Sequence, residues 1–199
     1  MLYHDIRGAF RYGHRKTFAP VALKYLTIEG ADITRSSPYE AVNYYMLERL
    51  LKTFCDLSPE TSIVDLGCGK GRVMVVAAHF GFKKLIGIEF AKELCIEASR
   101  NMERTQVAIN DIHWKVIHAN VLDYPIQPDD AVFFMFNPFD EQTLSLFLDK
   151  LERSCNQNPR KTWFIYASPQ HAVTLEKRGY QMAYWKKLMN LEGKILYKD

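Results

Sequence analysis

The sequence has no long hydrophobic run and no recognisable leader. Among its 199 residues there is no stretch of about 18 uncharged apolar residues, the length that a membrane-spanning helix needs. Residues 1–5 (MLYHD) lack the basic and apolar regions that begin a secretory signal peptide. We therefore expect no membrane span and predict a cytoplasmic protein.

Cysteine is scarce and irregularly spaced. The four cysteines, Cys55, Cys68, Cys95 and Cys155, form no C-x-x-C pair. This usage suits a reducing compartment and gives no support to a disulfide framework or a zinc site. Histidine and acidic residues also lack the spacing of metal ligands, so we expect no metal.

Internal repeats and dense basic runs are absent too. The net charge of +3 is unevenly distributed: residues 1–27 carry +4, residues 28–149 carry −7 and residues 150–199 carry +6. Such a distribution could steer an anionic partner, although an interspersed, solvated surface is the simpler interpretation. No basic run is dense enough to indicate nucleic-acid binding. The length fits one domain with a substantial core.

Glycine is concentrated in one informative segment, residues 63–72 (IVDLGCGKGR). The apolar residues Ile63 and Val64 lead to an acid, Asp65, and three alternating glycines follow. Directly after them, residues 73–78 form an apolar run of helix-compatible length. A strand, a glycine-rich turn and a helix N-terminus form the place where α/β proteins hold the charged part of a nucleotide-like ligand.

The spacing of these glycines separates two families of ligand. A dinucleotide fingerprint, G-x-G-x-x-G, would require glycine at position 72, where this chain has Arg72. An acid two residues before G-x-G-x-G resembles motif I of the class I S-adenosylmethionine (SAM) dependent methyltransferases. The resemblance implies SAM as cofactor and S-adenosylhomocysteine (SAH) as product. It places the following residues against the amino-acid half of SAM: Asp65, Gly67, Cys68, Gly69 and Gly71.

Two later segments support the same family. Residues 84–90 (KLIGIEF) look like a second buried strand that ends in an acid, Glu89, whose carboxylate can accept hydrogen bonds from both ribose hydroxyls. A strand-edge acid of this kind is expected to contribute little to stability, and Phe90 to pack against adenine or in the core. Residues 114–123 resemble the adenine-contacting segment of the family, with Asn120 and Val121 at the cofactor.

A fourth segment, residues 131–139 (AVFFMFNPF), ends in Asn-Pro-aromatic. It resembles the N-P-P-Y or N-P-P-F motif of amino-group methyltransferases, although one proline is missing. The resemblance implies that Asn137 lies at the cofactor and orients the target nitrogen, and that Phe139 stabilises developing positive charge. Both residues are therefore candidate catalytic residues.

Apolar runs and helical stripes alternate along the rest of the chain. We predict strands near residues 61–66, 84–89, 113–118, 131–136 and 162–167, and helices near 39–54, 70–81, 92–105, 140–156 and 169–178. A terminal β-hairpin is predicted around a turn at residues 190–193. The fold class is therefore α/β: a doubly wound, mostly parallel seven-stranded sheet with a C-terminal antiparallel hairpin, helices on both faces and an N-terminal helical or irregular lid.

The segment before the first strand is expected to cover the cofactor. Residues 1–56 are predicted to form an N-terminal arm and lid helix, starting from a cap at Ser36 or Ser37, and residues 57–199 the SAM-binding core of the same domain. Its candidate substrate or lid residues are Tyr39, Glu40 and Tyr44. Lys70 and Arg72, at the start of the helix after the glycine loop, are expected to be solvated.

The function predicted from the sequence is SAM-dependent methyl transfer, with a small molecule or a protein side chain as acceptor and an amine nitrogen as the candidate atom. Two alternatives remain at this point. One is a non-catalytic SAM-binding module that supports a partner. The other is a nucleotide-dependent oxidoreductase, which Arg72 disfavours. The oligomeric state cannot be inferred from the sequence.

Overall fold

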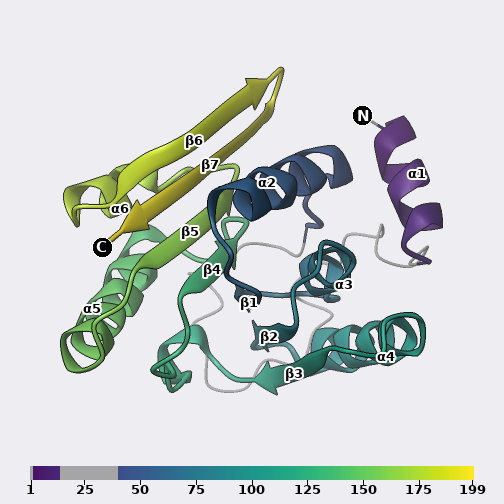
Figure 1. Cartoon of the computed structure of the whole chain (residues 1–199), viewed down its shortest axis with the longest axis horizontal. Coiled ribbons are helices and arrows are strands. Elements are labelled where there is room, and N and C mark those ends of the chain that lie inside the picture. Colours follow the sequence, from purple (N-terminus) through teal and green to yellow (C-terminus); the bar gives the residue numbers. More distant parts are fainter. Residues whose placement is uncertain (1, 14–39) are drawn as a thin grey trace.

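The computed structural model describes residues 2–13 and 40–199, which form one sheet flanked by helices (Figure 1). The strands are β1 (Ser62–Leu66), β2 (Lys84–Glu89), β3 (His113–His118), β4 (Val132–Met135), β5 (Thr162–Ala167), β6 (Gln181–Leu188) and β7 (Leu191–Lys198). The helices are α1 (Leu2–Arg11), α2 (Tyr44–Leu57), α3 (Arg72–His79), α4 (Lys92–Ala108), α5 (Glu141–Gln157) and α6 (Ala172–Lys177), with a 3₁₀ helix, η4 (Val121–Asp123).

The seven-stranded sheet has the order β3-β2-β1-β4-β5-β7-β6. Strands β1 to β5 pair in parallel, and β7 pairs antiparallel with both β5 and β6. The predicted fold class and the five parallel strands are confirmed, with every strand end within one residue of its predicted place. The chain order reverses beside β1, which is where α/β sheets open a ligand crevice at the carboxyl ends of their strands.

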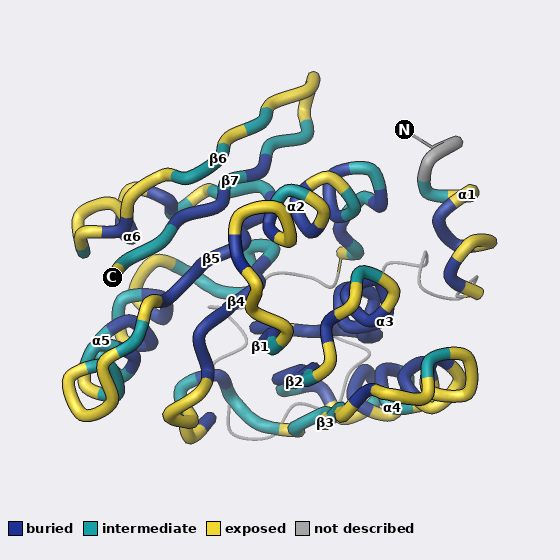
Figure 2. Tube along the Cα trace, viewed as in Figure 1, coloured by how far each residue is buried: buried dark blue, intermediate teal, exposed yellow. Residues whose placement is uncertain are grey.

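Helices cover both faces of the sheet, which explains the near-continuous apolar runs of its central strands. One hydrophobic core joins the sheet to α2, α3 and α4, and a second joins it to η4, α5 and α6. The central strands are buried, whereas the outward faces of the helices are exposed (Figure 2). No helix in the described part of the chain is long and apolar enough to cross a membrane.

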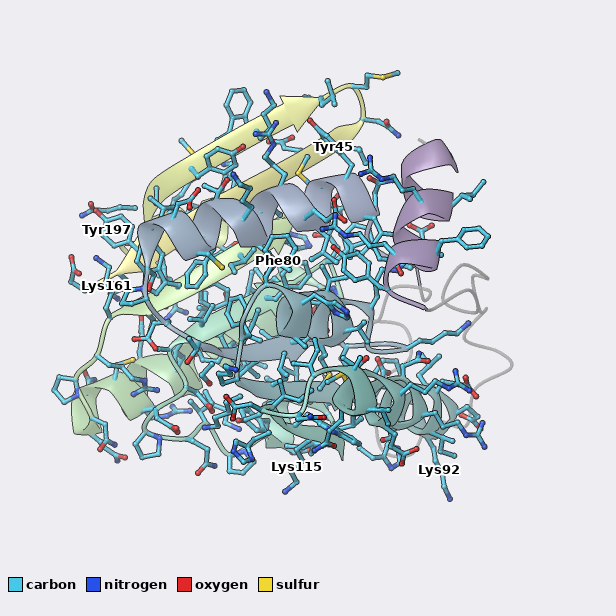
Figure 3. All side chains as sticks on the ribbon, turned by 45° about the vertical axis from the view of Figure 1, so that its right-hand side comes forward. Tyr45, Phe80, Lys92, Lys115, Lys161 and Tyr197 are labelled. Carbon is cyan, nitrogen blue, oxygen red and sulfur yellow. The ribbon has the colours of Figure 1, made fainter. Side chains whose placement is uncertain are left out.

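Charged side chains lie along one edge strand of the sheet, β3, and beside the interior pair β5 and β7. On β3, His113, Lys115 and His118 are exposed, and Figure 3 shows Lys115 pointing away from the molecule. Near the end of the neighbouring pair β5 and β7, the ammonium of Lys161 lies 4.0 Å from the ring centre of Tyr197 (Figure 3). Charges on an edge oppose its pairing with another chain.

The C-terminal hairpin is confirmed, but its turn is tighter than predicted. Met189 and Asn190 make the turn, and Gly193 lies inside β7. Gly193 is placed there by packing, because a Cβ at this position would come within 2.9 Å of side-chain atoms of Met46 and Leu50 on α2. The glycine therefore marks the close approach of α2 to the sheet.

The N-terminal helices differ from the prediction. Helix α2 begins at Tyr44, where the side chain of Asn43 caps it by accepting from the backbone N–H of Tyr45. The predicted cap at Ser36 or Ser37 is therefore wrong, since residues 40–43 are not helical and the two serines lie outside the described residues. Helix α1 was not predicted, because residues 1–35 have no clear helical periodicity. The inward residues of α2 are fully buried, so this helix is part of the core.

Candidate active site

A cavity of about 310 Å³ opens at the carboxyl ends of the central strands. Residues that follow β1, β2, β4 and β5 line it, together with residues 40–42 before α2. Of the predicted site residues, the cavity brings together Glu40, Asp65, Gly67, Cys68, Glu89, Phe90 and Asn137. The position agrees with the ligand crevice expected for this strand order.

Asp65 is the most unusual group in the cavity wall. It lies on β1 with only 2% of its surface exposed, and its Oδ2 atom has no hydrogen-bond partner among the described residues. Burial, and then the nearby charge of Glu89, raises the pKa of its carboxyl well above the ordinary value. A buried acceptor without a donor is costly for a folded protein, so this atom indicates a ligand that supplies a donor or a positive charge.

The glycine loop is held to β2 by backbone hydrogen bonds. The N–H groups of Gly67 and Cys68 both donate to the carbonyl of Ile88, at 2.9 Å. Gly67 has a φ of 76°, and a Cβ there would come within 2.5 Å of Pro138. Only glycine fits both conditions, because L side chains rarely adopt positive φ.

The other two glycines serve the protein itself. Gly69 has a φ of 53°, and its N–H donates to Oε2 of Glu89 at 2.9 Å. Gly71 precedes α3 with a φ of 77° and packs against Ala98, which a Cβ would approach to 3.2 Å. Neither lines the cavity, so their predicted contacts with the cofactor remain predictions.

Glu89 holds the loop as well as lining the cavity. Its two carboxylate oxygens accept from the N–H groups of Gly69 and Ala91, each at 2.9 Å, and the residue is 4% exposed. Burial raises its pKa in spite of these hydrogen bonds. The expectation that Glu89 matters little to stability assumed few contacts, whereas these hydrogen bonds and the burial lead us to predict a contribution. Each oxygen keeps a further lone pair, which a ribose hydroxyl can use.

Arg72 and Lys70 are buried, contrary to the expectation of solvated charges. The Arg72 guanidinium lies 4.3 Å from the ring centre of Tyr44, donates to the carbonyl of Val42 at 2.7 Å and forms an ion pair with Asp5 of α1 at 3.5 Å. A planar guanidinium can stack and donate at once, so it is suited to joining three segments.

The three predicted lid residues have different places. Glu40 is exposed and lines the cavity. Tyr44 is 1% exposed beneath Arg72, so in this structure it supports the wall from behind. Tyr39 lies outside the described residues. The segment that reaches the cavity is therefore residues 40–42, just before α2.

Asn120, Val121 and Phe139 do not line this cavity. The side chain of Asn120 caps η4 by accepting from the N–H of Leu122 at 2.9 Å, and Val121 is buried in the second core. Phe139 packs against the same core. The difference for Phe139 has a physical reason: with one proline after Asn137, Asp140 already caps α5 by accepting from Thr143, which leaves the aromatic ring against the core.

Two strand ends at the cavity have unusual backbone conformations. Asn137, after β4, has a φ of 44°, and Ser168, after β5, has a φ of 49°. Non-glycine residues with positive φ are uncommon, cost about 1–3 kcal/mol each and cluster at functional sites. Both residues line the cavity, next to Gln170. Ser168 and Gln170 were not among the predicted site residues, although the rule that located Asn137, a polar residue after an apolar strand, also applies to Ser168.

The comparisons with known proteins agree with this geometry. The model of a methyltransferase domain family matches residues 63–158. A protein-lysine N-methyltransferase of Saccharolobus islandicus is 35% identical over 71 residues, 35% of this chain and 44% of that protein. A ribosomal protein L11 methyltransferase of Cupriavidus taiwanensis is 31% identical over 81 residues, 36% of this chain and 27% of that protein. The chain thus spans less than half the length of these curated relatives.

Among solved structures, magnesium protoporphyrin IX methyltransferase from Synechocystis PCC 6803, determined with bound SAM, has the same fold. Its TM-score is 0.56 at 12% identity, over 98% of this chain and 94% of that one. Residues 63–158 thus match a methyltransferase domain family, and the described fold is one that SAM-dependent methyltransferases have. SAM is the cofactor of this family.

The residues of the cavity fit SAM. Three carboxylates, those of Glu40, Asp65 and Glu89, line it, and SAM carries positive charge on its sulfonium and amino groups. The buried Oδ2 of Asp65 is an acceptor without a partner among the described residues. Aromatic side chains, Phe90 and Phe136, supply apolar faces on the same wall. The chemistry of this donor and acceptor set therefore matches a cationic nucleoside.

Proposed function

We propose that this chain transfers a methyl group from SAM to an amine nitrogen of a protein side chain or a small molecule. The observation that carries the proposal is that a single cavity is lined both by residues predicted to bind the cofactor and by further polar residues at other strand ends. We assign Asp65, Glu89 and Phe90 to a cofactor part of this cavity, and Asn137 and Ser168, which also line it, to an acceptor part. Adjacent sites of this kind are what alignment of two reactants needs.

The cofactor part would hold SAM through both polar and apolar side chains. Asp65 would accept from its amino-acid half, Glu89 from the ribose hydroxyls, and Phe90 would pack on the adenine. When bound, SAM supplies an electrophilic methyl group on a sulfonium. The chain's own contribution is then to orient the acceptor and exclude water, since this displacement depends mainly on alignment.

The acceptor part favours a group that is cationic in solution. Glu40 is exposed at the entrance, where its carboxylate can attract an ammonium that later loses its proton. The lysine side chain that the Saccharolobus relative modifies, by its name, has this chemistry. An amine of a protein or a small molecule is therefore the acceptor class we propose.

We also propose that the N-terminal segment covers the site. Residues 40–42 line the cavity, and Arg72 ties this segment to α1 through the Val42 carbonyl and Asp5. The four cysteines are unpaired. That observation supports a reducing, cytoplasmic location, which we propose on the same terms as the sequence prediction.

Two measurements test the function. Calorimetry should detect binding of SAM and of SAH to the purified chain, and absence of both with an intact fold would refute the proposal. Labelled SAM added to a cell lysate with the chain should then transfer its methyl group to a protein or a small molecule. Binding without any transfer would favour a non-catalytic SAM-binding module, and a preference for NAD over SAM would favour an oxidoreductase.

A further inference from the structure

The side chain of Asn137 is held in one orientation by a buried tyrosine that does not itself line the cavity. Tyr166, on β5, is 1% exposed, and its hydroxyl lies 2.8 Å from the amide oxygen of Asn137. The same hydroxyl accepts from the backbone N–H of His171 at 3.1 Å. Tyr166 was not among the site residues predicted from the sequence.

These contacts decide which end of the Asn137 amide faces Tyr166. The N–H of His171 donates to the Tyr166 oxygen, which leaves the hydroxyl hydrogen free to donate to Asn137. A backbone N–H can only donate, and the N–H of Gln170 lies 3.5 Å from the same Asn137 atom, so that atom is the oxygen. Burial also raises the pKa of Tyr166 to about 12, so the hydroxyl stays protonated at neutral pH.

The other end of the amide, the NH₂ group, is then left for a ligand. Its Nδ2 atom has no acceptor among the described residues, and it is not one of their buried unpartnered side-chain atoms. Asn137 lines the cavity, beside Ser168. Both residues have a positive φ, which non-glycine residues disfavour, so the surrounding structure must hold the backbone of this wall in place.

We infer that Tyr166 is a positioning residue that turns the Asn137 NH₂ group toward the cavity, and that the acceptor substrate carries an oxygen that accepts a hydrogen bond from it. This inference rests on the proposed function and refines it. The family resemblance assigns the amide oxygen of Asn137 to the target nitrogen, whereas here that oxygen is directed to Tyr166. An amine with a nearby carbonyl, as in a peptide, satisfies both the NH₂ group and the carboxylate of Glu40.

A pair of probes tests the inference without turnover. Nα-acetyl-lysine methylamide has an amine and two carbonyl oxygens, and n-butylamine has the amine alone. With SAH bound, the wild-type chain should bind the first probe roughly five- to tenfold more tightly, the factor expected for one hydrogen bond. In ¹⁵N-labelled protein, that probe alone should shift the Nδ2 resonances of Asn137. Loss of those resonances in Asn137→Asp identifies them.

Three variants complete the test. Tyr166→Phe should change the Nδ2 resonances in the ligand-free protein and abolish the preference between probes. The matched control is Tyr180→Phe, because Tyr180 is also buried and its hydroxyl bonds to Thr162 away from the cavity. It should leave both measurements unchanged. Asn137→Asp keeps an oxygen for Tyr166 but loses the donor, so it should lose the preference too.

Several results would overturn the inference. They are equal binding of the two probes by the wild type, absence of any Nδ2 shift with the lysine derivative, or an Asn137→Asp or Tyr166→Phe variant that keeps the preference. Affinity for SAM, measured separately, distinguishes the two proposals. A chain that does not bind SAM refutes the proposed function, whereas a chain that binds SAM but shows one of these results refutes only this further inference.

Discussion

The two parts of the cavity that we assign to the cofactor and to the acceptor, the cofactor half and the acceptor half, are built in different ways. The cofactor half comes from short local segments, in which each strand and the loop after it carry the important residues: Asp65 with its glycine loop, and Glu89 with Phe90. In the acceptor half, the orientation of Asn137 depends on Tyr166, 29 residues further along the chain, and on residues after it. Local segments can be identified from the sequence, whereas an orientation set by a distant side chain cannot.

From this comparison we expect the largest loss of SAM binding when the backbone of the cofactor half is altered. Gly69→Val should abolish SAM binding, because valine is strained at a φ of 53° and would displace the loop that Glu89 holds. Calorimetry with SAM measures the loss. Gly81→Val is the matched control: its φ is also positive, at 94°, but a Cβ there meets nothing within 4 Å. It should lower stability and keep binding; equal binding by both variants would contradict the prediction.

A substitution in the acceptor half should lower turnover. Once a substrate is known, Asn137→Ala should reduce kcat by roughly 10²-fold, the scale of misalignment effects, while SAM affinity changes little. Asn158→Ala, at the end of α5 and away from the cavity, serves as control. Unchanged turnover in the Asn137 variant would show that this strand end takes no part in orienting the acceptor.

Glu89 links the two properties of the cofactor half, binding and stability. Glu89→Ala should weaken SAM binding by about 1–3 kcal/mol and also lower the free energy of unfolding, by roughly 1–2 kcal/mol, because two backbone N–H groups lose their acceptor. Calorimetry and urea unfolding measure the two effects. Glu97→Ala removes an exposed ion pair with Arg100 and should change neither by more than about 0.5 kcal/mol. A Glu89 variant with full stability would contradict the observed role of its oxygens.

The smallest effect is expected from Asp65, in the ligand-free protein. Its pKa is raised by burial, so the folded state binds more protons than the unfolded state above the ordinary aspartate pKa, and stability falls as pH rises through that window. Asp65→Asn cannot ionise and should be more stable than the wild type by roughly 1 kcal/mol at pH 7, with a smaller difference at pH 5. Urea unfolding at both pH values measures this difference, and calorimetry should show weaker SAM binding. A difference that is independent of pH would argue against a buried, ionising carboxyl.

Much of the fold could be predicted because its signals are local and periodic. The parallel strands are apolar runs bounded by polar turns, so their ends were placed within one residue. The beginning of α2 was misplaced because a serine before proline is a strong cap signal, whereas Asn43, the actual cap, stands inside the apolar pattern. The hairpin turn was misplaced because Gly193 looked like a turn residue, although packing against α2 explains it.

The site residues that could be predicted are those whose place follows from a local sequence pattern. Asp65, Glu89 and Asn137 lie at or just beyond the carboxyl ends of their strands, and the rule for parallel sheets brings such ends together. The burial of Arg72 could not be foreseen, since its partners, Asp5 and Tyr44, come from other segments. The same reason applies to Tyr166, which reads as an ordinary core residue in an apolar strand.

The stacking of Arg72 on Tyr44 has a consequence for how this sequence can change over evolutionary time. Three distant positions share one buried charge, so a substitution at any of them alone leaves the others in an unfavourable environment. Losing the arginine would leave Asp5 with donors from Asn43 and Tyr44 but without its ion pair, and losing Asp5 would leave the buried guanidinium with the Val42 carbonyl and the Tyr44 ring. We therefore expect the residue on the first helix and the arginine beside the glycine loop to change together.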